Sequence, residues 1–389
     1  MNIKNESYQS LKDLQTVCLE QNIPFASYRL PLQSEIVTLV QHQSYPEKID
    51  ILNDPEQKKG FIVAPFFETN HHAAYILEPD SIFYNGNIDP GFTDQLSRNS
   101  GLLFSENRIS KELVTTSRED FIRHVNDARE AITRGKFHKV VLSKVRVENL
   151  NAEFNAADFF LHLCETYPHA FVYLMQLPEV GCWAGATPEP LLLIEGGKVE
   201  TVSLAGTQLA TGSPIDEYRW TDKEIEEQGI VTGFVEKTLH SLQIDKYLVS
   251  GPSNYQAANL IHLKTTFEFE KADLGDRIGE CLKALHPTPS VGGLPKDSAR
   301  NFILKNEKHD RTYYTGFIGP LNIDNKSRLF VNLRCLQLFK KQFVLYSGAG
   351  ITESSIAENE WEETDNKMMT MMNAMIKEPP TPKGEEEKK

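Results

Sequence analysis

Long hydrophobic runs are missing from this chain of 389 residues. Its apolar stretches, such as residues 170–175, are far shorter than the roughly 18 to 20 residues that a membrane-spanning helix needs. The N-terminal segment MNIKNESYQS also lacks the basic and then apolar profile of a secretory signal peptide. We therefore expect a cytoplasmic protein that is not associated with a membrane.

Paired cysteines and clustered positive charge are lacking as well. The five cysteines are odd in number and never spaced as CxxC, which argues against a disulfide framework and against a zinc site. The 41 Lys and Arg residues face 54 Asp and Glu residues, and 41 − 54 gives a formal charge of −13. Since nucleic-acid binding depends on clustered basic side chains, we expect no nucleic-acid partner. A small anionic ligand is still compatible with this composition.

Signatures of common cofactor and nucleophile sites are absent: GxxxxGK[ST], GxGxxG after a strand, HExxH and GxSxG do not occur. Carboxylates are plentiful instead. Glu224 and Glu227 lie near the start of one predicted helix, and Glu360 and Glu363 lie in the last one, each pair with the spacing that puts both on one helical face. Two such faces would suit Mg²⁺ if they came together, but acidic residues in a first helical turn are more often solvated.

Helical and strand patterns occur in clusters rather than in strict alternation. This order indicates an α+β fold, a large single domain of packed, mainly antiparallel sheets with helices on the outside. We expect one catalytic domain over 1–376, whose first part, 1–110, carries no chemical signal, and a disordered, charged tail over 377–389. The predicted helices are 117–135, 158–166, 221–242, 274–285, 298–305 and 358–376, and the predicted strands are 138–147, 171–177, 182–186, 191–194, 199–204, 316–321, 329–338 and 343–347.

Several single polar residues stand out among apolar neighbours. Arg334 lies within the predicted strand 329–338, and Lys367 lies in the last helix. An Arg fork and a Lys point charge would together hold a carboxylate, although each is also compatible with an ordinary surface position. Lys139 opens KVVLSKV and Glu189 ends GATPEP; either residue alone carries little information.

Taken together, the blocks of the second part of the chain resemble a known family. KVVLSK, GATPEPLL, VSLAGT, HLKTTFEF, LHPTPSVGG, DRTYYTGFIG, NLRCLQ, YSGAGI and ENEWEETDNK follow one another within 120–376. In this order they resemble the signature blocks of the chorismate-utilising enzymes, which include isochorismate, salicylate, anthranilate and aminodeoxychorismate synthases. The resemblance implies the fold of that family, chorismate as substrate and Mg²⁺ as cofactor.

The resemblance also implies the metal-binding residues. Glu227 and Glu363 match the two glutamates that bind Mg²⁺ in the family, and Glu224 and Glu360 match positions in its outer shell. The ion would hold the ring carboxylate of chorismate.

The positions that would bind substrate are matched in the same way. Arg334 and Lys367 match the clamp on the enolpyruvyl carboxylate. Gly206, Thr207 and Gly348 match positions where the backbone approaches the substrate closely. His286 would orient the hydroxyl region of the ring.

Two positions bear on the type of reaction. Lys139 matches a lysine that isochorismate and salicylate synthases are proposed to use to activate water, where anthranilate synthases have glutamine. Ala205 stands where many aminodeoxychorismate synthases carry a nucleophilic lysine. The resemblance therefore favours an isochorismate synthase, in which Lys139 is the general base for water attack at ring C2 and Glu189 is the general acid for loss of the C4 hydroxyl. A salicylate synthase, which then eliminates pyruvate, and a catalytically silent chorismate-binding protein are the alternatives.

Two residues depart from the pattern of the family. Gln228 replaces a usual histidine beside Glu227, which bears on the outer shell of the metal, and Lys264 replaces a small or apolar residue, which bears on substrate fit. The resemblance further implies a chain without a glutaminase subunit, as a monomer or weak homodimer. Both menaquinone and siderophore biosynthesis are compatible with it.

Overall fold

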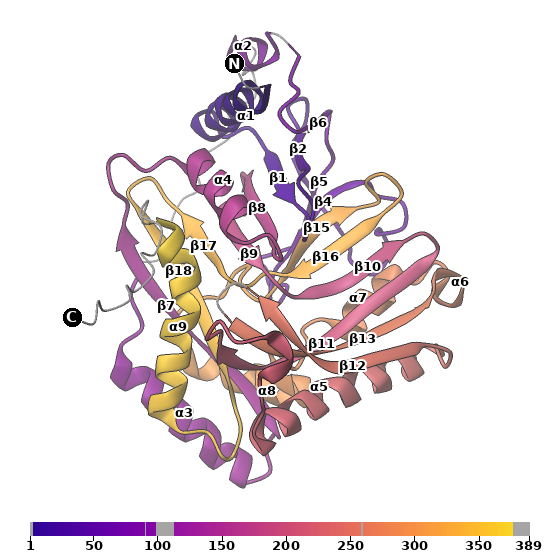
Figure 1. Cartoon of the computed structure of the whole chain (residues 1–389), viewed down its shortest axis with the longest axis vertical. Coiled ribbons are helices and arrows are strands. Elements are labelled where there is room, and N and C mark those ends of the chain that lie inside the picture. Colours follow the sequence, from indigo (N-terminus) through magenta and orange to yellow (C-terminus); the bar gives the residue numbers. More distant parts are fainter. Residues whose placement is uncertain (1–2, 90, 99–112, 258–259, 376–389) are drawn as a thin grey trace, which may run out of the picture.

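Two nine-stranded antiparallel sheets form the centre of the structure (Figure 1). The computed structural model describes residues 3–89, 91–98, 113–257 and 260–375, so the predicted disordered tail lies outside the described residues. The first sheet has the order β14 (Gly293–Leu294), β7 (Lys139–Asn149), β18 (Gln342–Ile351), β17 (Cys335–Leu338), β9 (Gly181–Thr187), β8 (Phe171–Leu177), β1 (Phe25–Arg29), β2 (Ile36–Val40), β6 (Ser81–Tyr84). The second has the order β12 (Leu248–Ala257), β13 (Leu260–Glu270), β11 (Lys198–Leu209), β10 (Pro190–Glu195), β16 (Ser327–Val331), β15 (Phe317–Leu321), β4 (Gly60–Ala64), β5 (Tyr75–Leu77), β3 (Glu47–Lys48).

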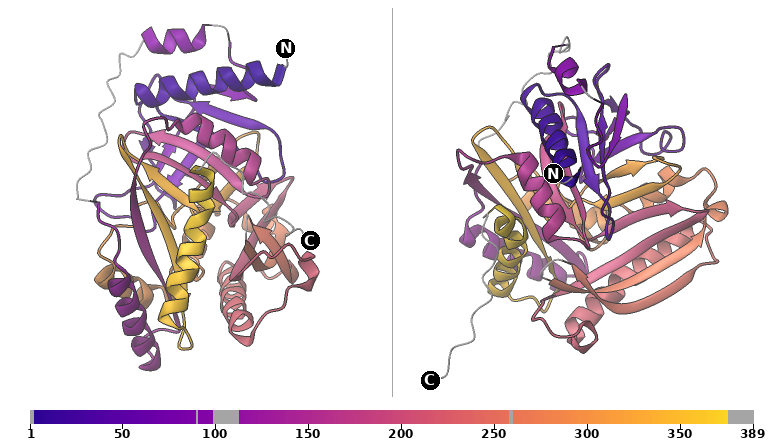
Figure 2. Two further views of the ribbon diagram at one scale, coloured as in Figure 1. Left: turned by 60° about the vertical axis from the view of Figure 1, so that its left-hand side comes forward. Right: turned by 45° about the horizontal axis from the view of Figure 1, so that its top comes forward.

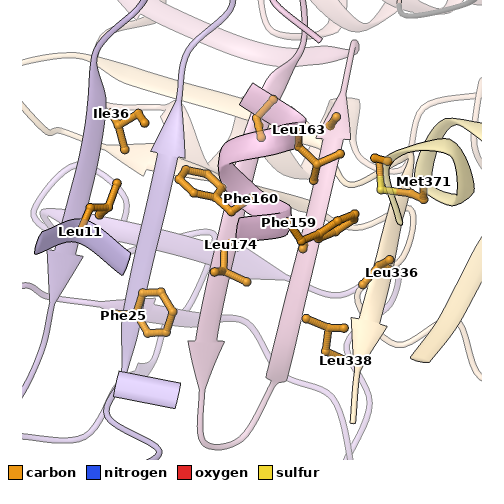
Figure 3. Close-up of a cluster of buried hydrophobic side chains, with 14 of the residues drawn as sticks. Leu11, Phe25, Ile36, Phe159, Phe160, Leu163, Leu174, Leu336, Leu338 and Met371 are labelled. Atoms are coloured by element: carbon orange, nitrogen blue, oxygen red, sulfur yellow. The ribbon is translucent and has the colours of Figure 1, made fainter. Parts of the chain in front are cut away.

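Helices cover the outer faces of both sheets (Figure 2). On the first sheet, side chains of three helices, among them Leu11, Phe160 and Met371, pack against the strand residues Leu174 and Leu336 (Figure 3). These large apolar side chains are withdrawn from water, which is the main contribution to the stability of the fold. The helices are α1 (Ile3–Glu20), α2 (Phe92–Arg98), α3 (Arg118–Thr133), α4 (Ala156–Thr166), α5 (Asp222–Ser241), α6 (Lys271–Leu274), α7 (Ile278–Leu285), α8 (Lys296–Asn306) and α9 (Ala357–Met375), with one 3₁₀ turn at Ile215–Glu217.

The inner faces of the sheets meet in a layer rich in aromatic side chains. Phe171 of β8 and Phe330 of β16 stack there with ring centres 4.3 Å apart. On the outer face of the second sheet, Val235 of α5 and Leu282 of α7 belong to the same apolar cluster as Phe267 of β13. The layers are therefore helices, sheet, sheet, helices, which confirms the predicted α+β fold of packed antiparallel sheets.

The N-terminal part of the chain belongs to both sheets. Strands β1, β2 and β6 extend the first sheet, and β4, β5 and β3 extend the second. Residues 1–110 gave no chemical signal in the sequence, and within the described residues their strands complete the two sheets. None of the helices described by the structure is both long and apolar enough to span a membrane.

Three features differ from the predictions. The predicted strand 329–338 is wrong, because β16 belongs to the second sheet and β17 to the first, and the link between them contains Arg334 with a φ of 48°. The run looked continuous because both strands are buried. The predicted helix 274–285 is likewise two helices, interrupted at Gly275, where φ is 58°. The hairpin of β12 and β13 was not predicted.

Candidate functional site

A cavity of about 700 Å³, including its mouth, lies among β11, β13, β18, α5 and α9. Its lining comes from segments far apart in the sequence, because both sheets contribute to it. Most of the residues that the sequence singled out line this cavity: Glu189, Gly206, Thr207, Glu227, Arg334, Gly348, Glu363 and Lys367.

Lys139 lies directly behind the lining, at the start of β7. Its side chain is fully buried, and Nζ lies 2.6 Å from Oε1 of Glu227 on α5. Gly350 makes this contact possible, since a Cβ there would lie 2.8 Å from Glu227 Oε1 and 2.8 Å from Lys139 Cε. The buried amine therefore lies against the cavity wall at Gly350 and is paired with the carboxylate of Glu227.

Glu189 lies between β9 and β10 and is almost fully buried. Burial raises the pKa of its carboxyl group to about 7, and the positive charges of Lys139, Lys367 and Arg334 only partly oppose that rise. A carboxylic acid with this pKa keeps its proton in about half of the molecules near neutral pH. Glu189 can therefore donate a proton into the cavity, as a general acid must.

The two carboxylate-bearing helices come together near their N-terminal ends, which the sequence had left open. Glu227 of α5 and Glu363 of α9 both line the cavity. Burial raises the pKa of Glu227, but the charges of Lys139, Lys367 and Lys223 outweigh it, so the net pKa is lowered and the group stays charged. Two carboxylates with several waters are a usual environment for protein-bound Mg²⁺, so this donor set fits that ion.

Further protein ligands are not gathered at this point. Across residues 3–89, 91–98, 113–257 and 260–375, no three His, Cys, Asp or Glu side chains form a group that could hold a metal. Glu360 lies behind Glu363 and pairs with Lys223 of α5 at 3.0 Å. This position is compatible with its predicted place in an outer shell.

Glu224 caps α5: its carboxylate accepts a hydrogen bond from the backbone N–H of Thr221 at 2.9 Å and another from the Thr221 hydroxyl. This is a capping box, which stabilises the start of a helix. Glu224 does not line the cavity itself, but its side chain lies next to Gly206, which does. Its place in the outer shell of a metal stays a prediction.

Arg334 and Lys367 place two positive charges in the cavity wall. Burial lowers the pKa of Arg334 to about 10, which still leaves the guanidinium protonated at neutral pH. Its Nη1 donates to the hydroxyl of Thr370 on α9 at 3.3 Å. Lys367 Nζ lies 2.6 Å from Glu363 Oε1 and donates to the carbonyl of Gly348 at 3.0 Å. An anionic group that entered the cavity would meet both cations.

His262 of β13 also lines the cavity, and the sequence reasoning missed it. Its Nδ1 lies 2.9 Å from the carbonyl oxygen of Gly206, so Nδ1 must carry the proton, while Nε2 is buried without a partner in the structure. Burial and the charge of Arg334 lower the pKa of His262 to about 3. The neutral ring therefore offers a free acceptor to a ligand hydroxyl. The alternation of HLKTTFEF along a strand could have identified it.

His286 is not brought to the cavity. Its Nε2 lies 3.2 Å from the carbonyl oxygens of Pro65 and Phe66, its ring packs edge-on against Phe317, and burial lowers its pKa to about 4. The structure thus corrects its assignment to substrate binding. Ser290 and Val291 of the same LHPTPSVGG block line the cavity instead.

The two departures from the family pattern both lie outside the cavity lining. The Gln228 amide donates to the hydroxyls of Ser203 at 2.9 Å and Thr265 at 3.0 Å, so it holds α5 on the second sheet. Lys264 Nζ lies 3.9 Å from Glu200 and 5.1 Å from the ring centre of Tyr255. Neither side chain alters the residues available to a ligand or a metal.

Charges at the site balance one another. Glu227, Glu360 and Glu363 each pair with a lysine: Lys139, Lys223 and Lys367, respectively. Arg334 is a fourth cation, and Glu189, which carries its proton in about half of the molecules near neutral pH, partly offsets its charge.

Comparisons with known proteins identify relatives of the chain. Residues 92–376 match the family model described as "Chorismate binding enzyme". The chain is 27% identical over 273 residues to the vibriobactin-specific isochorismate synthase of Vibrio cholerae, covering 69% of each protein. It is 28% identical over 269 residues to the isochorismate synthase DhbC of Bacillus subtilis, covering 66% of this chain and 68% of the relative.

Solved structures show the same fold. The menaquinone-specific isochorismate synthase MenF of Escherichia coli superposes with a TM-score of 0.73 at 22% identity, over 93% of this chain and 91% of that chain. Component I of anthranilate synthase from Streptococcus pneumoniae gives a TM-score of 0.62 at 18% identity, over 89% of each chain.

Proposed function

The chain belongs to the family of chorismate-binding enzymes, and from this premise we propose that it is a Mg²⁺-dependent isochorismate synthase. In this reaction water adds at ring C2 of chorismate, the ring double bonds shift, and the C4 hydroxyl leaves as water, so that the product is an isomer of the substrate. One observation carries the proposal: a buried amine, Lys139, and a carboxylic acid with a pKa of about 7, Glu189, lie beside the same cation-lined cavity.

Binding of the substrate follows from the charges of the cavity. Chorismate carries two carboxylates, and Arg334 with Lys367 would hold the one on the enolpyruvyl group. Glu227 and Glu363 would hold Mg²⁺, which supplies the positive charge that anchors the ring carboxylate. His262 would accept a hydrogen bond from a ring hydroxyl through its free Nε2.

Proton transfer would use the two buried groups. Lys139 takes a proton from the attacking water, and Glu189 gives its proton to the departing hydroxyl. The ammonium of Lys139 is now paired with Glu227. If Glu227 and Glu363 held the metal ion, the Glu227 carboxylate would no longer be given to Lys139 alone. The side chain of Lys139 would then be released to face the attacking water and act as the base.

Water as the nucleophile is supported by two residues. Ala205 lines the cavity, so no amine is offered at the position where aminodeoxychorismate synthases carry a nucleophilic lysine. Lys139 stands where anthranilate synthases have glutamine. The relatives named above as isochorismate synthases agree with this choice.

Product analysis tests the proposal directly. Purified protein would be incubated with chorismate, with and without Mg²⁺ and with an ammonium salt as a competing nucleophile, and the products separated by chromatography. We expect isochorismate that forms only with the metal ion. Salicylate as the main product would identify a salicylate synthase instead, and an amino product or no turnover would refute water transfer at this site.

A further inference from the structure

A buried arginine behind the cavity uses every hydrogen-bond donor that it has. Arg311 Nε donates to Glu307 Oε2 at 2.8 Å, and Nη2 donates to Glu307 Oε1 at 2.6 Å and to the carbonyl of Val141 at 2.6 Å. Nη1 donates to the carbonyl of Val291 at 2.9 Å and faces the hydroxyl of Thr315 at 3.5 Å. All five N–H groups of the guanidinium are thus engaged.

Three of these partners belong to the cavity wall. Val141 on β7, Val291 in the turn before β14, and Thr315 before β15 all line the cavity, whereas Arg311 does not. These three residues come from separate segments of the chain. One buried side chain therefore ties three parts of the wall together from behind, without itself reaching a ligand.

Glu307 acts on the same strand. Its Oε1 accepts a hydrogen bond from the backbone N–H of Ser143 on β7 at 2.7 Å. On this edge of β7 the short strand β14 pairs only with Lys139 and Val140. The backbone N–H and C=O groups of the β7 residues after Val140 therefore have no neighbouring strand on this side. An unpaired buried backbone group is costly, and the Glu307 carboxylate with the Arg311 guanidinium supplies the missing partners.

We infer that Glu307 and Arg311 form a positioning pair for the reaction proposed above, on which this inference rests. The pair fixes β7 from Val141 to Ser143, and Lys139 lies at the start of the same strand on the same face, since side chains alternate along a strand. Lys139 must be placed accurately for proton transfer, because small displacements of a catalytic group lower the rate strongly. Neither member of the pair contacts Arg334 or Lys367 in the structure.

Two variants separate positioning from folding. Arg311→Lys keeps the charge but offers three donors in place of five, so at least two of the contacts are lost. The double variant Glu307→Gln with Arg311→Met removes both charges together, so that no unpaired charge is left buried. As a matched control, Arg277→Lys alters an arginine that donates to the carbonyls of Leu274 and Leu242 and does not contact the cavity lining.

Two measurements report on the pair. Hydrogen exchange followed by mass spectrometry, without substrate, should show faster exchange over residues 139–147 in both variants and an unchanged rate over residues 171–177. Steady-state kinetics should show a fall in kcat of about 10- to 100-fold, with a change in the KM for chorismate of less than about threefold. The Arg277→Lys control should change neither quantity.

Each possible outcome supports or contradicts the role of Glu307 and Arg311. Unchanged exchange over residues 139–147 in both variants would show that the pair does not position β7, whatever the reaction is. Faster exchange with an unchanged kcat would overturn its link to catalysis. A double variant that fails to fold would assign the pair to global stability instead. A wild-type protein without turnover would contradict the proposed function, while the exchange measurement would still test the pair.

Discussion

Replacing Lys139 by glutamine should make the protein bind Mg²⁺ more tightly. In the structure the ammonium of Lys139 lies 2.6 Å from Glu227 Oε1 and is fully buried, so it neutralises the charge of the carboxylate that would hold a metal ion. A metal ion that binds Glu227 must compete with this ammonium for the carboxylate. Lys139→Gln removes the competing charge and leaves a neutral hydrogen-bond donor.

The size of the effect follows from the environment of the pair. Removing one partner of a buried ion pair costs about 3–5 kcal/mol of stability. Here the Glu227 side chain is 18% exposed, and Lys367 and Lys223 also act on its charge, so we take about 2–3 kcal/mol. If the metal ion recovers that energy, its affinity rises by a factor of ten for each 1.4 kcal/mol, or about 30- to 140-fold.

Calorimetric titration of metal-free protein with MgCl₂, in the absence of substrate, measures this change. Lys144→Gln is a matched control, because Lys144 lies on the same strand and pairs with Asp365 at the same 2.6 Å, but neither residue lines the cavity. The control should lose stability and keep the wild-type affinity for Mg²⁺. An equal or weaker affinity of Lys139→Gln would refute the competition between Lys139 and the metal ion, and with it the way in which the base is prepared.

Three further changes test single residues. Because the raised pKa of Glu189 keeps it protonated below about pH 7, kcat/KM should fall above that pH; Glu189→Gln should lower turnover about 10²- to 10⁴-fold and abolish this limb of the pH profile. Glu363→Gln should weaken Mg²⁺ binding at least about tenfold in a calorimetric titration, and unchanged metal dependence would remove Glu363 from the ligands. Arg334→Lys should raise the KM for chorismate about 10- to 100-fold through loss of the fork, with Mg²⁺ affinity unchanged; an unaltered KM would exclude the clamp.

Local signals in the sequence predicted where α3 and α5 begin. Ser117 accepts a hydrogen bond from the backbone of Asp120 at the start of α3, and Thr221 with Glu224 caps α5, as the residue types indicate. The strand 329–338 was misread because the link at Asn332, Leu333 and Arg334 is short and lies between two apolar, buried strands, so that its polar residues were read as one face of a single strand. A change of sheet depends on contacts that are distant in the sequence, and propensity does not report them.

The same difference between local signals and contacts distant in the sequence holds for the candidate site. The motif blocks identified most of the residues that line the cavity, since each block is a short, continuous stretch of the sequence that can be recognised locally. The contact between Lys139 and Glu227 joins residues 88 positions apart, and the free Nε2 of His262 depends on a carbonyl of another strand. The structure corrected the assignment of His286, whose Nε2 lies against the carbonyls of Pro65 and Phe66, 221 and 220 positions away in the sequence. Contacts at this separation leave no signal in the local sequence.

The balance of charges at the site predicts how metal ion and substrate depend on each other. Three charged carboxylates, together with Glu189, which carries its proton in about half of the molecules, face four cations there. A metal dication alone adds two positive charges and a dicarboxylate alone adds two negative ones, while both together leave the net charge of the site unchanged. Each should therefore bind more tightly in the presence of the other, and by the same factor, because coupling between two binding equilibria is reciprocal. We expect a coupling of about 5- to 150-fold, measured by titrating Mg²⁺ at several concentrations of chorismate with the turnover-deficient Glu189→Gln variant. If Mg²⁺ and chorismate bind independently of each other, their sites are too far apart for electrostatic interaction. That result would refute the assignment of Glu227 and Glu363 as metal ligands beside the substrate carboxylate.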